Sequence, residues 1–274
     1  MTSFSRLRSL GAILALGLGF VAPLAASASA TGSGEEVRAQ LDQAAVAYKQ
    51  TAAADIQSVV AGVERMVAAL QQGDIATARQ AWIDARVGWE RSEIFTVDLF
   101  PDQDKAIDGW QQPRSGFHAV EAKLFLANQP PPIGEALVLL DELQRFQRVF
   151  TQATFNGYYL IAGMATHVYD IGRDEWSGGE SSVSGTSLSD LKHNMEGLDR
   201  AWRFIFADAV LAKAPDLGKR IDYEIAGVRA LLEVPSIDQL DGTTLKSEAE
   251  NLAASLAEAS MALGWRAPHY TEAP

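Results

Sequence analysis

Apolar residues recur every three or four positions along most of the chain, and this spacing is typical of one face of an α-helix. The longest such stretch begins near Glu35 and continues to Leu70, and Gly73 ends it. Asp74 then stands as a candidate N-cap for a second helix that extends to about Trp89. Because the turn between the two helices is so short, the pattern predicts an antiparallel helical hairpin.

Later segments repeat this spacing. They predict a short helix over 117–126 and a long apolar stripe over 140–168, in which glycines could bend the helix. Three more stripes cover 188–205, 217–232 and 245–263. No segment alternates apolar and polar residues with turn signals as a strand does. We therefore predict an all-α protein with about six long helices, built as helix bundles in two four-helix-bundle-like lobes packed together.

Two segments interrupt the helical spacing. Residues 95–115 contain Pro101, Gly109 and Pro113 among clustered acids, and this composition predicts an ordered loop with little regular structure. Residues 172–186 are rich in glycine and serine and predict a second loop.

The N-terminal segment carries a different pattern. Two arginines precede an apolar run that ends in Ala-Ser-Ala at residues 28–30, as in a secretory signal peptide with its cleavage site. We therefore assign residues 1–30 to a cleaved signal peptide and residues 31–274 to a helical domain located in the periplasm. Pro23 interrupts the run, and no later segment is long and apolar enough to span a bilayer, so no stable membrane insertion is expected.

Charge and cysteine content narrow the chemistry. The chain has a formal net charge of −12, which becomes −14 without the two arginines of the predicted signal peptide. So acidic a protein is not expected to bind nucleic acid. The chain contains no cysteine, so a metal site would have to use oxygen and imidazole ligands.

Two pairs of residues have a spacing that suits a shared cation. Glu90 and Glu93 are three positions apart at the end of the second predicted helix, so their carboxylates project from one face. His118 and Glu121 have the same spacing in the short helix. Each pair also has an ordinary explanation. Arg86 lies four residues before Glu90 and could form a solvated ion pair with it, and a lone histidine is commonly a core residue.

The order Glu-x-x-Glu, acidic segment, Gly-x-His-x-x-Glu resembles the imelysin-like family, which includes the periplasmic iron-uptake components EfeO and EfeM and an alginate-binding relative. Residues 85–93 are similar to the family's Ala-Arg-x-x-Tyr-Glu-x-x-Glu, and residues 105–108 to its Pro-Lys-Ile-Asp. Residues 184–197 resemble its Ser-x-Thr-Asp-Leu-x-Asp-Phe-x-x-Asn-x-x-Gly. The helical part begins almost directly after the predicted signal peptide, so the resemblance is to the shorter, EfeM-like form without a cupredoxin domain.

The resemblance implies a single metal site. Its ligands would be Glu90, Glu93, Asp108, His118 and Glu121, with Glu175 from the second loop as an additional ligand. The cargo implied by the family is iron, as Fe2+ or Fe3+, delivered to an inner-membrane iron permease. The donor types alone also suit Zn2+, Cu2+, Mn2+ or Ca2+. The segment between Glu93 and Asp108 is one residue longer than the common family pattern, which leaves the roles of Asp98, Asp102 and Asp104 open.

Two other functions compete with metal uptake. His-x-x-Glu is a motif of metallopeptidases, but the chain lacks His-Glu-x-x-His, so we expect a binding protein and not an enzyme. The alternative is a polysaccharide-binding protein that works through a bridging cation, with Trp110 and Trp176 as stacking faces in the two loops. Trp82 and Trp89 lie on a helical stripe and are predicted core residues.

The remaining histidines carry no motif. His167 and His193 lie in predicted helices and are interpreted as structural, and His269 lies in the C-terminal tail.

Overall fold

The structure is a computed structural model that describes residues 33–173, 175–177 and 180–271. Within these ranges the chain forms helices and no strand, so the predicted all-α class is confirmed. Residues 1–30, the predicted signal peptide, lie outside the described residues. None of the described helices combines the length and the apolar composition needed to cross a bilayer.

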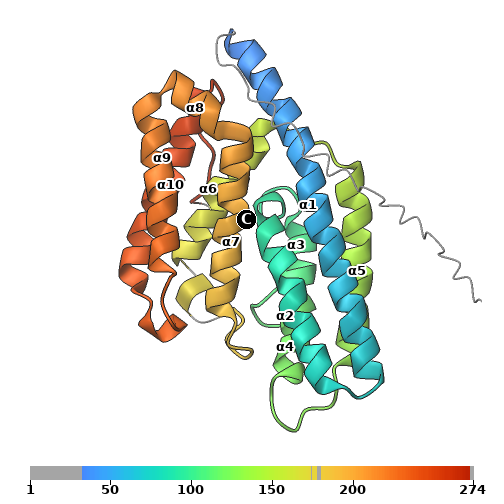
Figure 1. Cartoon of the computed structure of the whole chain (residues 1–274). Coiled ribbons are helices and arrows are strands. Elements are labelled where there is room, and N and C mark those ends of the chain that lie inside the picture. The colour runs from blue at the N-terminus through green and yellow to red at the C-terminus, as the bar shows by residue number, and fades with distance from the viewer. Residues whose placement is uncertain (1–32, 174, 178–179, 272–274) are drawn as a thin grey trace, which may run out of the picture.

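Two groups of helices lie side by side (Figure 1). The first lobe contains α1 (Gly34–Gln71), α2 (Ile75–Ser92), the 3-10 turn η1 (Glu93–Phe95), α3 (Pro101–Asp108), α4 (Gly116–Leu124) and α5 (Ile133–Gln152). The second lobe contains α6 (Gly157–Arg173), the 3-10 turn η2 (Glu175–Ser177), α7 (Ser187–Ala201), the π-helical segment η3 (Trp202–Phe206), α8 (Ala207–Lys213), α9 (Pro215–Leu231), the 3-10 turn η4 (Ile237–Gln239) and α10 (Gly242–Ala262). The predicted two-lobed arrangement is confirmed.

A side-chain cap and an aromatic core account for the start and the packing of α2 in the first lobe. Asp74 caps α2 by accepting a hydrogen bond from the backbone N–H of Thr77 at 3.1 Å, as its position after a glycine predicted. Trp82 and Trp89 are completely buried, which confirms them as core residues. The ring of Trp89 packs edge-on against Phe146 of α5, with ring centroids 5.8 Å apart.

The predicted loop over 95–115 is wrong in its middle, where α3 forms. Pro101 occupies the first turn, where a fixed φ favours helix and the missing N–H costs nothing. Asp102 and Asp104 lie in the same turn, where acidic side chains stabilise the positive end of the helix dipole. Proline and clustered acids therefore mark a helix start in this segment.

The apolar stripe over 140–168 also differs from expectation, because it is divided between α5 and α6. Ala153 is extended, and the side-chain oxygen of Asn156 accepts a hydrogen bond from the N–H of Tyr159 at 3.0 Å. Asn156 thus caps a new helix, and Asp42 of α1 accepts the N–H of Gly157 at 2.7 Å. Seven described helices therefore have 15 or more residues, against about six expected from the sequence.

The lobes meet where the end of α2 and η1 pack against α6 and α7. Gly163 of α6 allows this approach, because a Cβ at that position would overlap the carbonyl oxygen of Ile94. One helical turn after Gly163 comes His167, and one residue before Ile94 comes Glu93. The contact therefore brings polar side chains from the two lobes face to face.

Candidate metal centre

A cluster of polar and charged side chains, most of them buried, lies between the two lobes. The first lobe supplies Arg86 and Glu90 from α2, Glu93 from η1, Asp108 from α3, and His118 and Glu121 from α4. The second lobe supplies His167 from α6, Glu175 from η2, Glu180 from the following loop, and Asp190 and Asn194 from α7. All six residues of the predicted metal site belong to this cluster: five come from consecutive elements over residues 90–121, and Glu175 comes from the second lobe.

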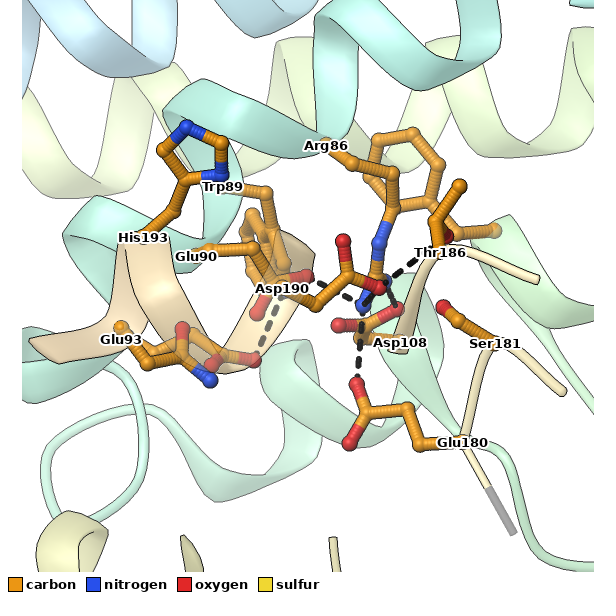
Figure 2. A network of polar contacts seen from close by, with 12 residues as sticks. Arg86, Trp89, Glu90, Glu93, Asp108, Glu180, Ser181, Thr186, Asp190 and His193 are labelled. Atoms are coloured by element: carbon orange, nitrogen blue, oxygen red, sulfur yellow. Dashed lines mark hydrogen bonds and ion pairs between the residues drawn. The ribbon is translucent and has the colours of Figure 1, made fainter. Parts of the chain in front are cut away.

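Arg86 is the fixed cation at the centre of the cluster, and it is 1% exposed. Figure 2 shows its guanidinium facing carboxylates from both lobes. It forms ion pairs with Glu90 and Asp108, and its Nη2 lies 2.8 Å from Glu180 and 3.1 Å from Asp190. The alternative of a solvated Arg86–Glu90 pair is therefore wrong, because the pair exists but is buried.

His118 is positioned by the glycine of its motif. Gly116 has φ of +52°, and a Cβ there would overlap the carbonyl oxygen of Ile107, so only glycine fits the turn that begins α4. The Nδ1 of His118 lies 2.9 Å from a carboxylate oxygen of Glu121, and its Nε2 lies 3.2 Å from Asp108. Burial alone would lower the pKa of His118, but Asp108 and the other carboxylates outweigh burial and hold the pKa well above its usual value.

Glu121 connects this histidine to the second lobe. One of its carboxylate oxygens accepts hydrogen bonds from the backbone N–H and the hydroxyl of Ser184, both at 2.7 Å. Its other oxygen faces His118. Burial would raise the pKa of Glu121, but these hydrogen bonds lower it, so the carboxylate is held ionised. The final residue of the Gly-x-His-x-x-Glu motif therefore fixes the orientation of the imidazole.

Two groups of three donors lie close enough to hold an ion. Donor atoms of Asp108, His118 and Glu180 all lie within 4.8 Å of one another, as do donor atoms of Glu90, Glu93 and Glu180. Glu180 belongs to both groups and is not among the site residues predicted from the sequence. The only sequence signal for Glu180 was an acid in a loop of glycines and serines, just before residues 184–197.

A cavity of about 510 Å³ connects the cluster to the surface. Its inner wall includes Glu93, Asp108, His167, Glu175 and Glu180. Its outer part is lined by exposed side chains, among them Asp102 and Lys105. An ion could therefore reach the buried carboxylates from solvent without separation of the lobes.

Three carboxylates that face this cavity, those of Glu93, Glu175 and Asp104, have raised pKa values. Burial, together with the neighbouring carboxylates of Glu90 and Asp108, raises the pKa of Glu93 well above its usual value. Burial and Glu180 do the same to Glu175. Burial also raises the pKa of Asp104 to about 7, although the Thr96 hydroxyl donates a hydrogen bond to it at 2.6 Å. The cluster thus contains more acid than its own cations can neutralise.

The three aspartates and two tryptophans whose roles the sequence left open divide into residues that line the cavity and residues that do not. Asp102 and Asp104 line it, whereas Asp98 accepts a hydrogen bond from Thr166 at 3.2 Å. Trp110 also lines the cavity. Trp176 packs against the core and donates its indole N–H to the carbonyl oxygen of Gly172, so its ring is not a free stacking face.

Comparison with known proteins agrees with the motifs. The family model described as imelysin matches residues 44–263. Iron uptake system component EfeM of Pseudomonas syringae pv. syringae is 30% identical over 139 residues, a match covering 47% of this chain and 48% of that protein, or about half its length. Iron uptake system component EfeO of Escherichia coli is 26% identical over 256 residues, covering 86% of this chain and 68% of that protein.

A solved structure supports the fold. The chain superposes on a protein of Parabacteroides distasonis, described as an iron-regulated protein A precursor, with a TM-score of 0.62 and 16% sequence identity. The match covers 86% of this chain and 97% of that structure, so the two proteins share the helical fold over most of their lengths. The imelysin family model matches residues 44–263, most of the chain, and this match shows that the chain belongs to the imelysin family.

Proposed function

We propose that this protein binds an iron ion between its two lobes and serves in the periplasm as the binding component of an iron-uptake system. Relatives named as iron uptake system components support the cargo and the setting. The ligands would come from the predicted set, Glu90, Glu93, Asp108, His118, Glu121 and Glu175, together with Glu180.

The observation that carries this proposal is the imbalance of buried charge. Seven carboxylates gather around two cationic side chains, Arg86 and His118; they belong to Glu90, Glu93, Asp108, Glu121, Glu175, Glu180 and Asp190. Burying unneutralised carboxylates costs free energy, which is why several of their pKa values are raised. A divalent or trivalent cation would replace the bound protons and offset that cost.

The chemistry of the donors limits the choice of ion. Carboxylates and imidazole suit Fe2+, Fe3+, Mn2+, Zn2+ and Cu2+, and a thiolate is excluded because the chain has no cysteine. The order of divalent affinities favours Cu2+ and Zn2+ over Fe2+ at such a site, so the choice of iron rests on the named relatives. By the same argument, an inner-membrane iron permease is the proposed partner.

We propose that the protein binds the ion without catalysis. The relatives are named as uptake components, and the His-Glu-x-x-His motif that combines two zinc ligands with a general base is absent from the sequence. A chelator-sensitive cleavage of a generic peptide set by the purified protein would show that this part of the proposal is wrong.

Anaerobic calorimetric titration with Fe2+, and in parallel with Mn2+ and Zn2+, tests metal binding directly. We expect His118→Ala to weaken the affinity by at least tenfold, because it removes the imidazole of one three-donor group. His193→Ala is the matched control, since His193 lines a separate groove with Lys192 and Glu196. Equal affinity in the wild type and the His118→Ala variant would contradict the proposed site.

A further inference from the structure

The imidazole of His167 is buried without the hydrogen bonds that a structural histidine usually forms. Its side chain is fully buried, and neither ring nitrogen has a partner at hydrogen-bonding distance and angle among the described residues. A buried polar atom without a partner is costly, and such groups in proteins are usually explained by a ligand, an ion or a functional role. The imidazole nevertheless lies in the wall of the cavity between the lobes.

The two nitrogens of His167 face two different carboxylates. Nε2 lies 3.7 Å from Oε2 of Glu93, and Nδ1 lies 3.9 Å from Oε1 of Glu175. Both distances are too long for hydrogen bonds. The distance from Nε2 to Glu93 does match the separation of about 3 to 4 Å expected between two ligand atoms that each lie about 2.1 Å from one metal ion.

The two carboxylates that face His167 lack the fixed cation found around His118. There Arg86 is paired with Asp108, and also with Glu90 and Glu180. Within the described ranges, by contrast, neither Glu93 nor Glu175 has a lysine or arginine nitrogen in ion-pair distance, although Lys105 and Arg173 line the same cavity. The hydrogen bonds to Glu93 and Glu175 come from neutral groups, the Trp89 indole at 3.0 Å and the Asn194 amide at 3.3 Å.

We propose that His167 is a metal ligand, and that its Nε2, 3.7 Å from Glu93 at the edge of the group of Glu90, Glu93 and Glu180, would join that group around a second cation. This position lies next to the one formed by Asp108, His118 and Glu180. The inference deepens the proposed function and rests on it for the nature of the cargo. Glu180 belongs to both donor groups, so its carboxylate would bridge two neighbouring ions. The occupant is a divalent first-row transition-metal ion, because an imidazole among carboxylates is a poor ligand set for Ca2+ or Mg2+.

Glu175 then has a different role from the one that the family resemblance implied. It faces Nδ1, the nitrogen opposite to the proposed metal-binding Nε2. Metal-bound histidines usually donate their other ring N–H to a carboxylate or carbonyl group, which fixes the tautomer and the ring orientation. Glu175 is therefore the positioning residue for His167 in the metal-bound state, in which the present 3.9 Å between Nδ1 and Glu175 would shorten to a hydrogen bond, and Asn194 holds the second oxygen of Glu175.

Nuclear magnetic resonance of the imidazole nitrogens tests this proposal directly. The chain has only four histidines, so the protein labelled with 15N-histidine gives few ring signals, and single His→Phe variants assign them. During titration of the full purified protein with Zn2+ we expect the Nε2 signals of His118 and His167 to shift. Those of His193 and the exposed His269 should stay unchanged.

Each outcome separates the two proposals. A shift at His118 without any shift at His167 would overturn the second position and leave the proposed function intact. A shift at His167 alone would support the second position and contradict the assignment of His118 as a ligand. No shift at either histidine, with Zn2+ in excess, would overturn both proposals.

A substitution gives an independent readout. In His167→Phe the ring keeps its approximate volume and loses two unpartnered nitrogens, so the metal-free protein should melt at the same or a higher temperature. Calorimetry should show two Zn2+ ions per wild-type chain and one in this variant. An unchanged number of bound Zn2+ ions in a folded His167→Phe protein would overturn the proposal. If the variant does not fold, the imidazole nitrogen signals of the wild-type protein show whether His167 binds the metal.

Discussion

Arg86 contacts more carboxylates than its single charge can neutralise, so we expect stability to be sensitive to the loss of this side chain. Removal of one partner from a buried ionic group leaves uncompensated charge and typically costs 3–5 kcal/mol. Arg86 touches four carboxylates from α2, α3, α7 and the loop before α7. Its side chain therefore joins both lobes as well as neutralising them.

We expect Arg86→Gln to lower the free energy of unfolding of the metal-free protein by about 3 kcal/mol or more at neutral pH. Arg145→Gln is the control, because Arg145 forms its ion pairs with Asp141 and Glu142 on an exposed surface and should contribute less than about 1 kcal/mol. Urea denaturation measures both. Similar losses in the two variants would show that the buried network does not stabilise the fold.

Asp104 gives the metal-free protein an unusual dependence on pH. Its pKa in the fold is about 7, above its ordinary value of 3.8, so the folded state binds a proton more tightly than the unfolded state. The contribution of this group to stability is therefore complete below pH 3.8 and is lost as the pH rises through 7.

Asp104→Asn should remove about 1 kcal/mol of the stability that the metal-free wild type gains between pH 8 and pH 6. Thermal unfolding at several pH values measures the difference. The exposed Asp102→Asn is a control within the same helical turn, and it should follow the wild type. If Asp104→Asn also follows the wild type, Asp104 does not titrate in this range.

Residue spacing predicted part of the site and missed the rest for a clear reason. Glu90 with Glu93, and His118 with Glu121, were noticed as pairs because residues three apart share a helical face, and the family resemblance joined the two pairs in one site. Glu180 and His167 join the cluster only through contacts between lobes, and no local spacing encodes such contacts. His167 in particular has the sequence environment of an ordinary core residue.

At the scale of elements, close packing between helices positions the donors. The carbonyl oxygen of Ile94 lies where a Cβ on Gly163 would be, so α6 can approach η1 only with glycine at this position. That approach places His167 beside Glu93.

Gly163→Ala should therefore destabilise the protein by roughly 1–3 kcal/mol, because added volume in a packed interface forces the backbone to shift. Gly227→Ala in α9 is a matched control. A Cβ at Gly227 meets nothing within 4 Å, so alanine should stabilise the helix by about 0.5–1 kcal/mol. Chemical denaturation of the two variants compares them, and a neutral Gly163→Ala would contradict the tight contact.

Periodicity located most helices because their apolar faces are long and continuous. It failed at α3, where the eight residues are too few to show a clear period. It also failed at the break between α5 and α6, because the apolar stripe continues across the break while the Asn156 cap starts a new helix. The short helix α3 and the Asn156 cap could therefore be located only from the three-dimensional structure.

At the scale of the whole molecule, the ion would connect the two lobes. The proposed donors come from α2, η1, α3 and α4 on one side, and from α6 and the loop before α7 on the other. An ion that binds only the folded state adds about 2.7 kcal/mol of stability when its free concentration is a hundred times the dissociation constant.

Hydrogen exchange should show this stabilisation in both lobes. With free Mn2+ at about a hundred times its dissociation constant, we expect slower exchange of the backbone amides at the end of α2 and at the start of α7, since both lie beside the cluster. The exposed start of α1 serves as an internal reference and should not change. Protection restricted to one lobe would mean that the ion does not link them.

Anomalous diffraction from crystals grown with Fe2+ under anaerobic conditions tests the central claim most directly. Data collected on either side of the iron absorption edge locate the ion without any assumption about its ligands. We predict an anomalous peak between the lobes within coordination distance of His118 Nε2, Asp108 and Glu180. Crystals with no iron peak in this cluster, or with iron bound only elsewhere on the surface, would contradict the account.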